Sequence, residues 1–528
     1  MAWDEAQYVI DEVMNGMKVN QITGIPPQNV SVFSVSAENQ QAKIKCTPPA
    51  DTVIDGQLIC TVAGVRIIRK TGKAPISPED GTLVLDVLKG QSIDAIDGNL
   101  TNGVTYYYGF FPYSDHGVYN YNQVNVKSVT PRAIKYWAFD QNFADKNPGT
   151  TISYPSDFAN SGFDKMHTNE GTGTATAGGW LDFLQDTLKN YPFMVDKAAQ
   201  AAYALNPSDY TKKKDGSGSD YNNTGYNGGA FAWLNKIYML EEFSSNGETR
   251  RVTFADRPVD GFVPAGFYDR EGNEMEGIWL PMGYMDANGR TLIAGTTPIA
   301  LKTVDQEWTL IKAFSSRAVF LGGPIMNILR DLEYMMFKST DIQSAAGHGR
   351  CGAGSQAVVA NQVVANGAVP GWKGTADKKT MNKYFHSQIL GSYQQWTRDP
   401  YILLIDGKLK MSDRYIYDLT GAKLIDTGLT FLTDSAWQYS CHLIKAGNDK
   451  LGSVLKQENT GSTSTGLCDG LYINTFGVKV GLRQGDAHND LIAGPGALAL
   501  SDEDSSAVWN DGVGVILLPP AGYAPEVQ

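Results

Sequence analysis

Charged residues, cysteines and long apolar runs are all scarce in this chain of 528 residues. Charged residues make up 19% of the chain and aromatic residues 11%. This profile excludes a disordered chain, which would be highly charged and poor in aromatic residues. It also excludes a coiled-coil rod, which needs far more Glu, Lys and Leu. No run approaches the roughly 18 apolar residues of a membrane-spanning helix, so we expect no membrane span.

The chain has only five cysteines, which are Cys46, Cys60, Cys351, Cys441 and Cys468. They form no C-x-x-C pair and no histidine lies at zinc-finger spacing, which argues against a structural zinc site. A sparse, odd set of cysteines is typical of buried free thiols in a reducing compartment. The first residues lack the basic and apolar leader of a secretion signal. We therefore expect a protein that stays in the cytoplasm or leaves it by another route, such as assembly into a virus particle.

Positive charge is also in short supply, because the net charge is −12 and the pI is about 5.1. A protein that binds the phosphate backbone of nucleic acid needs the opposite sign, so we expect no nucleic-acid partner. Glycine, in contrast, is abundant at 56 residues, well above an average share near 7%. Together with the aromatic content, this favours a loop-rich globular protein that is mainly β with some α.

The first two regions differ in pattern. The pattern of residues 1–24 has two interpretations. It indicates either a short helix that attaches the chain to a larger assembly or a frayed terminus. Residues 25–131 alternate apolar runs with turn residues, as a β-sandwich requires. Asn102-Gly103 precedes Thr105-Tyr-Tyr-Tyr, where a tyrosine hydroxyl can tie back to the preceding loop, as in a tyrosine corner. This stretch resembles a fibronectin type III domain, with Ile44 or Cys46 in place of the usual core Trp. Such domains are mostly spacers.

The remainder of the chain predicts three helices among irregular segments. One covers about residues 178–188 and presents an apolar stripe of Trp180, Phe183, Leu184 and Leu188. A second covers residues 323–336, with Pro324 at a natural first helical position. A third covers residues 307–315. We divide this part into an α+β region over residues 132–350 and a binding domain over residues 351–528. No obvious linker separates them, so whether they are one domain or two stays open at this point.

Motifs for catalysis are absent from the sequence. There is no G-x-S-x-G elbow, no phosphate loop that ends in Gly-Lys-Ser/Thr and no twelve-residue calcium loop. Cys441 and His442 are adjacent and would face opposite sides of a strand. This predicts one core thiol and one surface imidazole rather than a nucleophile and its base. We expect no cofactor and no metal. Glycoside hydrolysis needs only a pair of carboxylates, so a glycan depolymerase stays open as an alternative.

The C-terminal region contains short apolar runs separated by long polar loops, which is typical of a binding architecture. Its landmarks are Gly391 and Trp396, then Asp406-Gly407, Arg483 and Gly485, Gly494 and Leu498, and Trp509 and Gly512. Their order resembles the C-type-lectin-like fold of phage tail adhesins and of the variable proteins of diversity-generating systems. The stretches that begin at Tyr203 and Lys338 look like recurring segments of phage tail-fibre proteins. Trp509-Asn-Asp also matches a calcium-ligating tripeptide of lectins, but its companion motif is absent, so we expect Trp509 to pack in the core.

This resemblance implies a phage tail-fibre or receptor-binding protein of the virion, made in the cytoplasm of the bacterial host, that is not an enzyme. Its expected partners are a bacterial surface glycan or protein, other phage tail proteins and further copies of itself, because trimers are common in the family. The ligand-binding residues that we predict are Trp437, Tyr439, Asp486, His488, Asn489, Asp502 and Asp504. Two alternatives stay open, namely a structural tail or baseplate component and a tail-associated depolymerase.

Overall fold

The structure is a computed structural model that describes residues 24–169, 174–286, 296–349, 386, 395–434, 436–486 and 488–526. The chain divides into two compact units, residues 1–134 and 135–528. Both units are built largely from strands, and α-helices occur among the strands of the larger one, which confirms the predicted mainly β fold with some α. Apart from Gly24, the predicted attachment segment lies outside the described residues.

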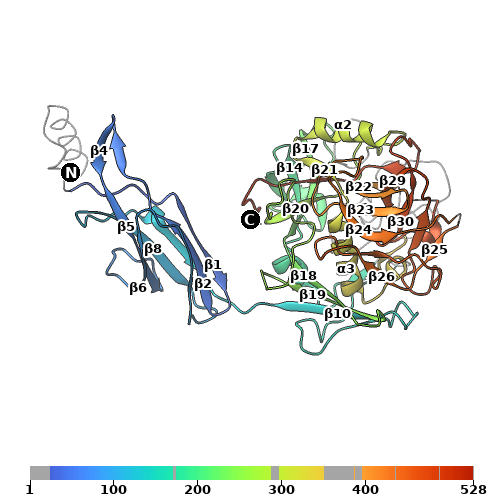
Figure 1. The fold of residues 1–528 in the computed structure, drawn as a ribbon, viewed down its shortest axis with the longest axis horizontal. Coiled ribbons are helices and arrows are strands. Elements are labelled where there is room, and N and C mark those ends of the chain that lie inside the picture. Colours follow the sequence, from blue (N-terminus) through green and yellow to red (C-terminus); the bar gives the residue numbers. More distant parts are fainter. Residues whose placement is uncertain are drawn as a thin grey trace. The chain divides into compact units, whose positions relative to one another are not determined.

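The smaller unit consists of two antiparallel sheets that share one core (Figure 1). The three-stranded sheet has the order β1 (Val32–Glu38), β2 (Gln41–Thr47), β7 (Ile93–Asp97). The four-stranded sheet has the order β6 (Thr82–Leu88), β5 (Val62–Thr71), β8 (Tyr106–Ser114), β9 (Val126–Val129). A separate hairpin of β3 (Thr52–Ile54) and β4 (Gln57–Cys60) leaves Val53, Ile54 and Leu58 about half exposed. The resemblance to fibronectin type III domains stays a prediction.

Two local predictions for the smaller unit are confirmed. Tyr106 begins β8, and its hydroxyl accepts a hydrogen bond from the backbone N–H of Thr101 at 3.0 Å, so the strand start is tied to the preceding loop. Ile44 and Cys46 are both fully buried in the core. Cys60, Cys441 and Cys468 are likewise buried free thiols, while Cys351 lies outside the described residues.

The larger unit contains three main sheets around one hydrophobic core. The first has the order β16 (Asp209–Lys213), β15 (Ala201–Asn206), β14 (Pro192–Asp196), β17 (Gly228–Asn235), β20 (Gly277–Pro281), β32 (Val515–Leu517), β21 (Ala318–Phe320). The second has the order β11 (Ile152–Ser153), β10 (Tyr136–Asn142), β19 (Thr249–Ala255), β18 (Tyr238–Phe243). The third has the order β24 (Ile425–Thr430), β23 (Lys408–Met411), β22 (Trp396–Ile405), β29 (Val478–Arg483), β30 (Leu498–Asp502), β28 (Gly470–Ile473), β25 (Gln438–Tyr439), and β31 (Asp511–Gly512) pairs with β22.

Strand pairing within the chain joins residues 132–350 to residues 351–528, the two regions into which we divided this part of the sequence. β32 comes from the C-terminal end of the chain, yet it pairs with β20 and β21 in the first sheet. Residues from both regions also pack into the same core, for example Phe139, Trp279 and Leu404. They therefore form one compact unit.

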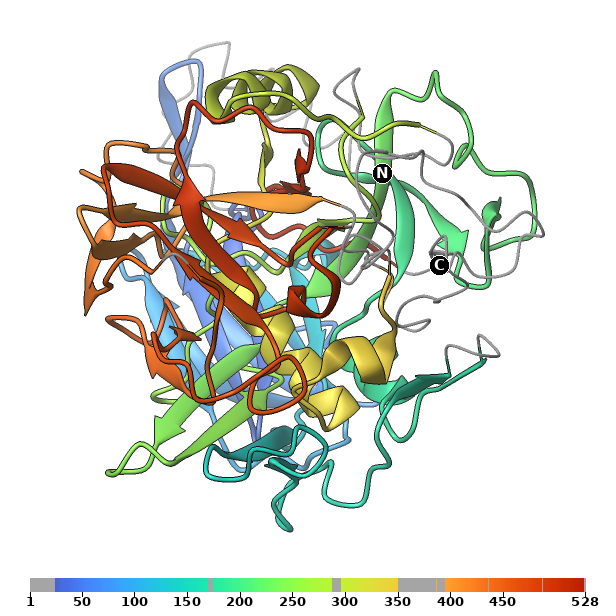
Figure 2. The same cartoon turned by 90° about the vertical axis from the view of Figure 1, so that its right-hand side faces the viewer.

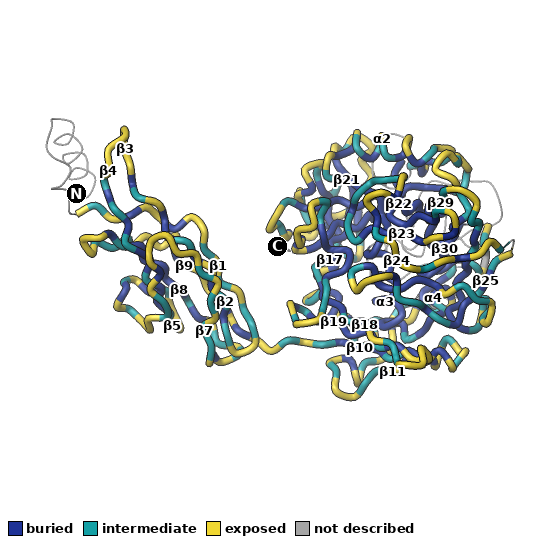
Figure 3. Tube along the Cα trace, viewed as in Figure 1, coloured by how far each residue is buried: buried dark blue, intermediate teal, exposed yellow. Residues whose placement is uncertain are grey.

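Helix α3 (Pro324–Phe337) runs through the interior of the larger unit (Figures 2 and 3), and every one of its residues is buried. Pro324 stands at its start, as the sequence predicts. The preceding Gly323 has φ +66°, a left-handed conformation that glycine adopts at little cost. Its N–H donates to the Asp399 carboxylate at 2.8 Å. α3 is therefore a core element rather than an amphipathic surface helix with one apolar stripe.

Of the other two predicted helices, the one over residues 307–315 is present, and the one over residues 178–188 is present only in part. α2 (Val304–Phe314) begins three residues earlier than expected, because Thr303 and Gln306 form a capping box at its start. Around residue 180 the predicted apolar stripe is buried as expected, but the backbone forms one π-helical turn over Phe183–Thr187 instead of a long α-helix.

Two small hairpins, β12 (His167–Asn169) with β13 (Thr174–Thr176) and β26 (Leu443–Lys445) with β27 (Ser453–Leu455), and the short helix α4 (Ile342–Ala346) complete the unit. No helix among the described residues is long and apolar enough to cross a membrane.

Candidate binding surface

Three of the predicted binding residues lie in one turn, where Asp486 plays a structural role. Asp486 is fully buried, and its Oδ1 accepts the backbone N–H groups of His488 at 2.8 Å and Asn489 at 3.1 Å. The side chain of Asn510 donates to its second oxygen. Burial raises the pKa of Asp486 although these donors favour the ionised form. His488 is exposed and Asn489 partly exposed, so only these two side chains can reach a ligand.

The aromatic candidates pack largely against their own sheet. Trp437 stacks parallel to Trp396, with ring centroids 5.9 Å apart, and tilts against Tyr472 at 5.2 Å. Trp437 and Tyr439 are both partly exposed. Tyr439 lies in β25, at the edge of the third sheet, and pairs with Gly470. Trp437 packs at the border of a small apolar cluster that includes Trp396 and Leu482, so it keeps only part of its surface for a ligand.

The segment of Trp509 lies next to this cluster, because the Trp396 N–H donates to the carbonyl of the neighbouring Asn510 at 2.7 Å and the Asn510 side chain bonds Asp486. Asp502 ends β30 and is partly exposed, whereas Asp504 is exposed and its backbone carbonyl accepts the N–H of Val304 at 3.1 Å. Trp509 is partly exposed, so the prediction that it packs in the core is wrong. Its carbonyl accepts a hydrogen bond from the Gln395 side chain, and the neighbouring carbonyls of Val508 and Asn510 accept the N–H groups of Leu301 and Trp396. The turn that holds Asp486, His488 and Asn489 lies close to Trp437, because Ile492 and Trp437 both pack beside Gly470 and the Ile492 N–H donates to the Asn489 carbonyl at 3.0 Å.

A more prominent surface lies where several loops meet at one end of the third sheet. We call it the tip surface, and its residues are Asp406, Gly407, Thr430, Phe431, Leu432, Thr475, Phe476 and Gly477. These loops connect β22 with β23, follow β24 and connect β28 with β29. They line a hollow of about 490 Å³. Phe476 is 86% exposed and Leu432 is 74% exposed.

Hydrogen bonds between the loops fix the backbone of the tip surface. The N–H of Asp406 donates to the carbonyl of Gly477 at 3.2 Å, and the N–H of Phe431 donates to the carbonyl of Gly407 at 2.8 Å. The side chain of Gln457 bonds both the N–H and the carbonyl of Leu432, at 2.7 and 2.6 Å. Because the backbone is held in place, Leu432 and Phe476 can bind a partner with little loss of conformational entropy.

Leu432 and Phe476 of the tip surface belong to none of the polar loops and aromatic landmarks on which the predicted binding residues were based. One signal was available, since Asn474-Thr-Phe-Gly477 places a large apolar residue in a turn between two strands. Turns are normally polar, so a phenylalanine at this position is an indication of an apolar contact surface. Its exposure could not be known before Thr433 and Thr475 were seen to hold the turn.

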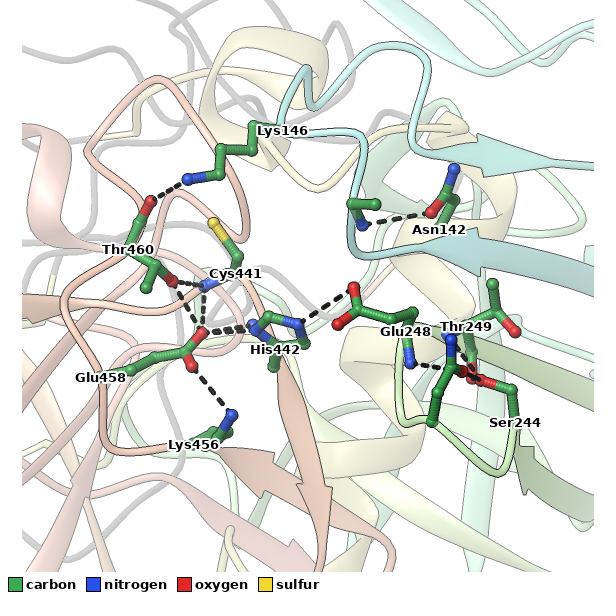
Figure 4. Close-up of polar contacts among 12 residues, drawn as sticks. Asn142, Lys146, Ser244, Glu248, Thr249, Cys441, His442, Lys456, Glu458 and Thr460 are labelled. Carbon is green, nitrogen blue, oxygen red and sulfur yellow. Dashed lines mark hydrogen bonds and ion pairs between the residues drawn. The ribbon is translucent and has the colours of Figure 1, made fainter.

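A second polar cluster surrounds His442 (Figure 4). Its Nδ1 lies 2.6 Å from Glu458 Oε1, and its Nε2 lies 3.8 Å from Glu248 Oε2. Glu458 also accepts the backbone N–H of Cys441 at 3.0 Å and the Thr460 hydroxyl at 2.8 Å. Burial raises the pKa of Glu458, but hydrogen bonds from His442, Thr460 and Lys456 outweigh it and lower this pKa to about 2.

This cluster has the orienting half of a catalytic arrangement. A carboxylate at Nδ1 fixes an imidazole as in hydrolase triads, but a triad also needs a nucleophile at the other nitrogen. Here the partner on the Nε2 side is the Glu248 carboxylate. The Cys441 thiol is buried as predicted, whereas the His442 side chain is only 20% exposed, so the prediction of a surface imidazole is wrong. The cluster links the hairpin over residues 243–249 to the loops over residues 440–442 and 456–460, so it holds these three segments in position relative to one another.

Another group of ionisable residues is sealed inside the larger unit. Arg398 lies 3.1 Å from Glu307 and 2.7 Å from Asp511, and all three side chains are at most 1% exposed. Burial raises the pKa of Glu307 well above its ordinary value, and raises that of Asp511 to about 7. The group fastens α2 to β22 and β31. Among the described residues no group of His, Cys, Asp or Glu could hold a metal ion.

No protein-family model matches this chain, and no curated protein matches it at a significant level.

Proposed function

We propose that this chain is a non-catalytic receptor-binding protein of a phage virion, which attaches the particle to a bacterial surface through the tip surface of its larger unit. The observation that supports this most directly is the exposure of Leu432 and Phe476 on loops whose backbone is fixed by hydrogen bonds. Large side chains on a rigid surface are typical of the residues that contribute most to binding energy.

The exposed apolar side chains of the smaller unit support the same proposal. The smaller unit has its own core and exposes several large apolar side chains, among them Val53, Ile54 and Leu58 of one hairpin. A two-stranded hairpin alone is only marginally stable in water, and an apolar one suits contact with another virion protein. Several copies on one particle, trimeric or otherwise, would multiply a modest affinity at each tip surface.

The test is binding of the labelled full-length chain to envelopes from a panel of bacterial strains. We expect saturable binding to a subset of strains. The double variant Leu432→Ala, Phe476→Ala should weaken this binding at least about tenfold, because truncation of a central binding residue costs about 2 kcal/mol or more. Both side chains are exposed, so the variant should unfold at the same denaturant concentration as the wild type.

The matched control is Ile76→Ala, which removes a side chain that is 64% exposed in the smaller unit and should leave envelope binding unchanged. A folded chain that binds no envelope but binds other virion proteins would contradict the proposal and favour a structural tail component. Release of reducing sugar ends from an envelope would contradict it in favour of a depolymerase. Equal losses in the double variant and the control would exclude the tip surface as the binding site.

A further inference from the structure

A separate groove lies over the outer face of the second sheet. Its lining includes Asp140, Asn142, Glu242, Ser244, Thr249 and Arg251, and we call it the outer-sheet groove. The strand register explains its polarity, because side chains alternate between the two faces of a sheet. In β10, Trp137 and Phe139 are buried in the core, while Asp140 and Asn142 belong to the other face. Across the ladder Asp140 pairs with Arg251, and Arg251 pairs with Glu242.

On the outer face, Asp140, Arg251 and Glu242 carry one net negative charge, while Arg250, which also lines the groove, pairs in the interior with Glu241 and Asp331. Arg251 Nε and Nη2 donate to the two oxygens of Asp140 at 2.6 and 2.7 Å, a two-point pairing that fixes both side chains. Glu242 is exposed, and among the residues that the structure describes no side chain or backbone group donates a hydrogen bond to it. The groove therefore offers a free carboxylate next to a neutralised pair, which disfavours an anionic ligand.

An aromatic ring borders the groove. The Arg251 guanidinium lies 5.8 Å from the ring centroid of Phe158, which is partly exposed. The segment that carries Phe158 is fixed along β10, since Ala159 N–H donates to the Tyr136 carbonyl at 2.9 Å and the Asn160 side chain bonds both backbone groups of Ala138. The guanidinium lies over this ring, and the part of the ring that stays exposed adds apolar surface next to the polar groups around Arg251.

We propose that the outer-sheet groove binds a neutral saccharide. Its volume of about 380 Å³ is at the lower end of small-molecule sites, as suits one or two sugar rings. Carboxylate acceptors match sugar hydroxyl donors, Asn142 and Arg251 supply donors, and the exposed part of the Phe158 ring offers an apolar contact at the border of the groove. A peptide is the weaker fit, because extended peptides pair with strand edges and this groove lies over a sheet face.

The test is titration of the full-length chain with neutral hexasaccharides of glucose and of N-acetylglucosamine, measured by calorimetry and by saturation-transfer NMR. Oligogalacturonate of similar length is the anionic comparison, and a hexapeptide of polar residues is the peptide comparison. We expect a neutral saccharide to bind and the anionic one to bind at least tenfold more weakly. Glu242→Ala and Phe158→Ala should each weaken neutral-saccharide binding at least fivefold, while Phe158→Tyr should retain it.

The control Glu276→Ala removes another exposed glutamate of the larger unit and should leave saccharide binding unchanged. No binding of either neutral hexasaccharide by the folded chain would overturn the inference. Preferential binding of oligogalacturonate or the hexapeptide would also overturn it, and so would equal affinity of the wild type and both alanine variants. The inference does not rest on the proposed function, because Leu432→Ala, Phe476→Ala should leave saccharide binding unchanged.

Discussion

Two buried acidic residues are expected to make the stability of the larger unit depend on pH. Glu333 in α3 and Asp469 before β28 are both buried. Burial, and then the Asp469 charge, raises the pKa of Glu333 to about 8. Burial likewise raises the pKa of Asp469 to about 8, although the Gly496 N–H donates to it at 2.7 Å. Both carboxyl groups therefore keep their protons in the folded chain at pH values where an unfolded chain would lose them.

Stability should consequently fall as pH rises. Below pH 4.5, the ordinary Glu value, the Glu333 carboxyl is protonated in both states, whereas between 4.5 and about 8 only the unfolded state releases its proton. Each such group can raise the unfolding constant by as much as about tenfold per pH unit. Glu333→Gln should flatten this slope between pH 5 and 7, as measured by urea unfolding followed by tryptophan fluorescence. The exposed control Glu276→Gln should keep the wild-type slope, and an equally steep slope in Glu333→Gln would contradict the prediction.

At the scale of elements, α3 shows what the sequence predicts and what it leaves out. Pro324 and the apolar spacing locate the helix to within a residue. They do not reveal that its polar residues are buried, because the partners are distant in sequence. Arg330 donates to the Ser453 carbonyl at 2.9 Å, and Asn327 donates to the Leu451 carbonyl at 2.8 Å. Asp486 was misjudged for the same reason, since its partner Asn510 lies outside its own loop.

Asp331 is the centre of the ionic contacts that anchor α3. It pairs with Arg330 of the same helix and with Arg250 of β19, and Arg250 in turn lies 2.7 Å from Glu241 of β18. Asp331→Ala leaves two buried guanidinium groups with too little negative charge, so it should cost about 3–5 kcal/mol of unfolding free energy. Chemical denaturation of the full chain measures this loss. The exposed control Asp260→Ala should change stability by less than about 0.5 kcal/mol, and a comparable loss in both variants would contradict the role of Asp331.

For the whole molecule, the decisive feature is that each unit has a core of its own. Tyr108, Ile67 and Ile44 belong to the core of the smaller unit, and no residue of the described chain before Lys135 enters the main core of the larger one. The boundary falls in a short connection, because Arg132 still bonds Glu38 of the smaller unit while β10 begins at Tyr136. Composition and turn spacing predict this boundary well, since the change of pattern near residue 131 reflects the end of one core.

Residues 24–134 and 135–528 should therefore fold when produced separately, each with its own cooperative transition in calorimetry. The full chain should show both transitions, each at nearly the same temperature as in the separate fragment, because two independent cores unfold separately.

If the tip surface binds the receptor, residues 135–528 should retain the envelope binding of the full chain per binding site, whereas residues 24–134 should show none. A fragment 135–528 that unfolds at a much lower temperature than its transition in the full chain would mean that the smaller unit stabilises the larger one. A folded fragment 135–528 without binding would instead place receptor contacts on the smaller unit, and the exposed hairpin of Val53, Ile54 and Leu58 would then be the surface to mutate.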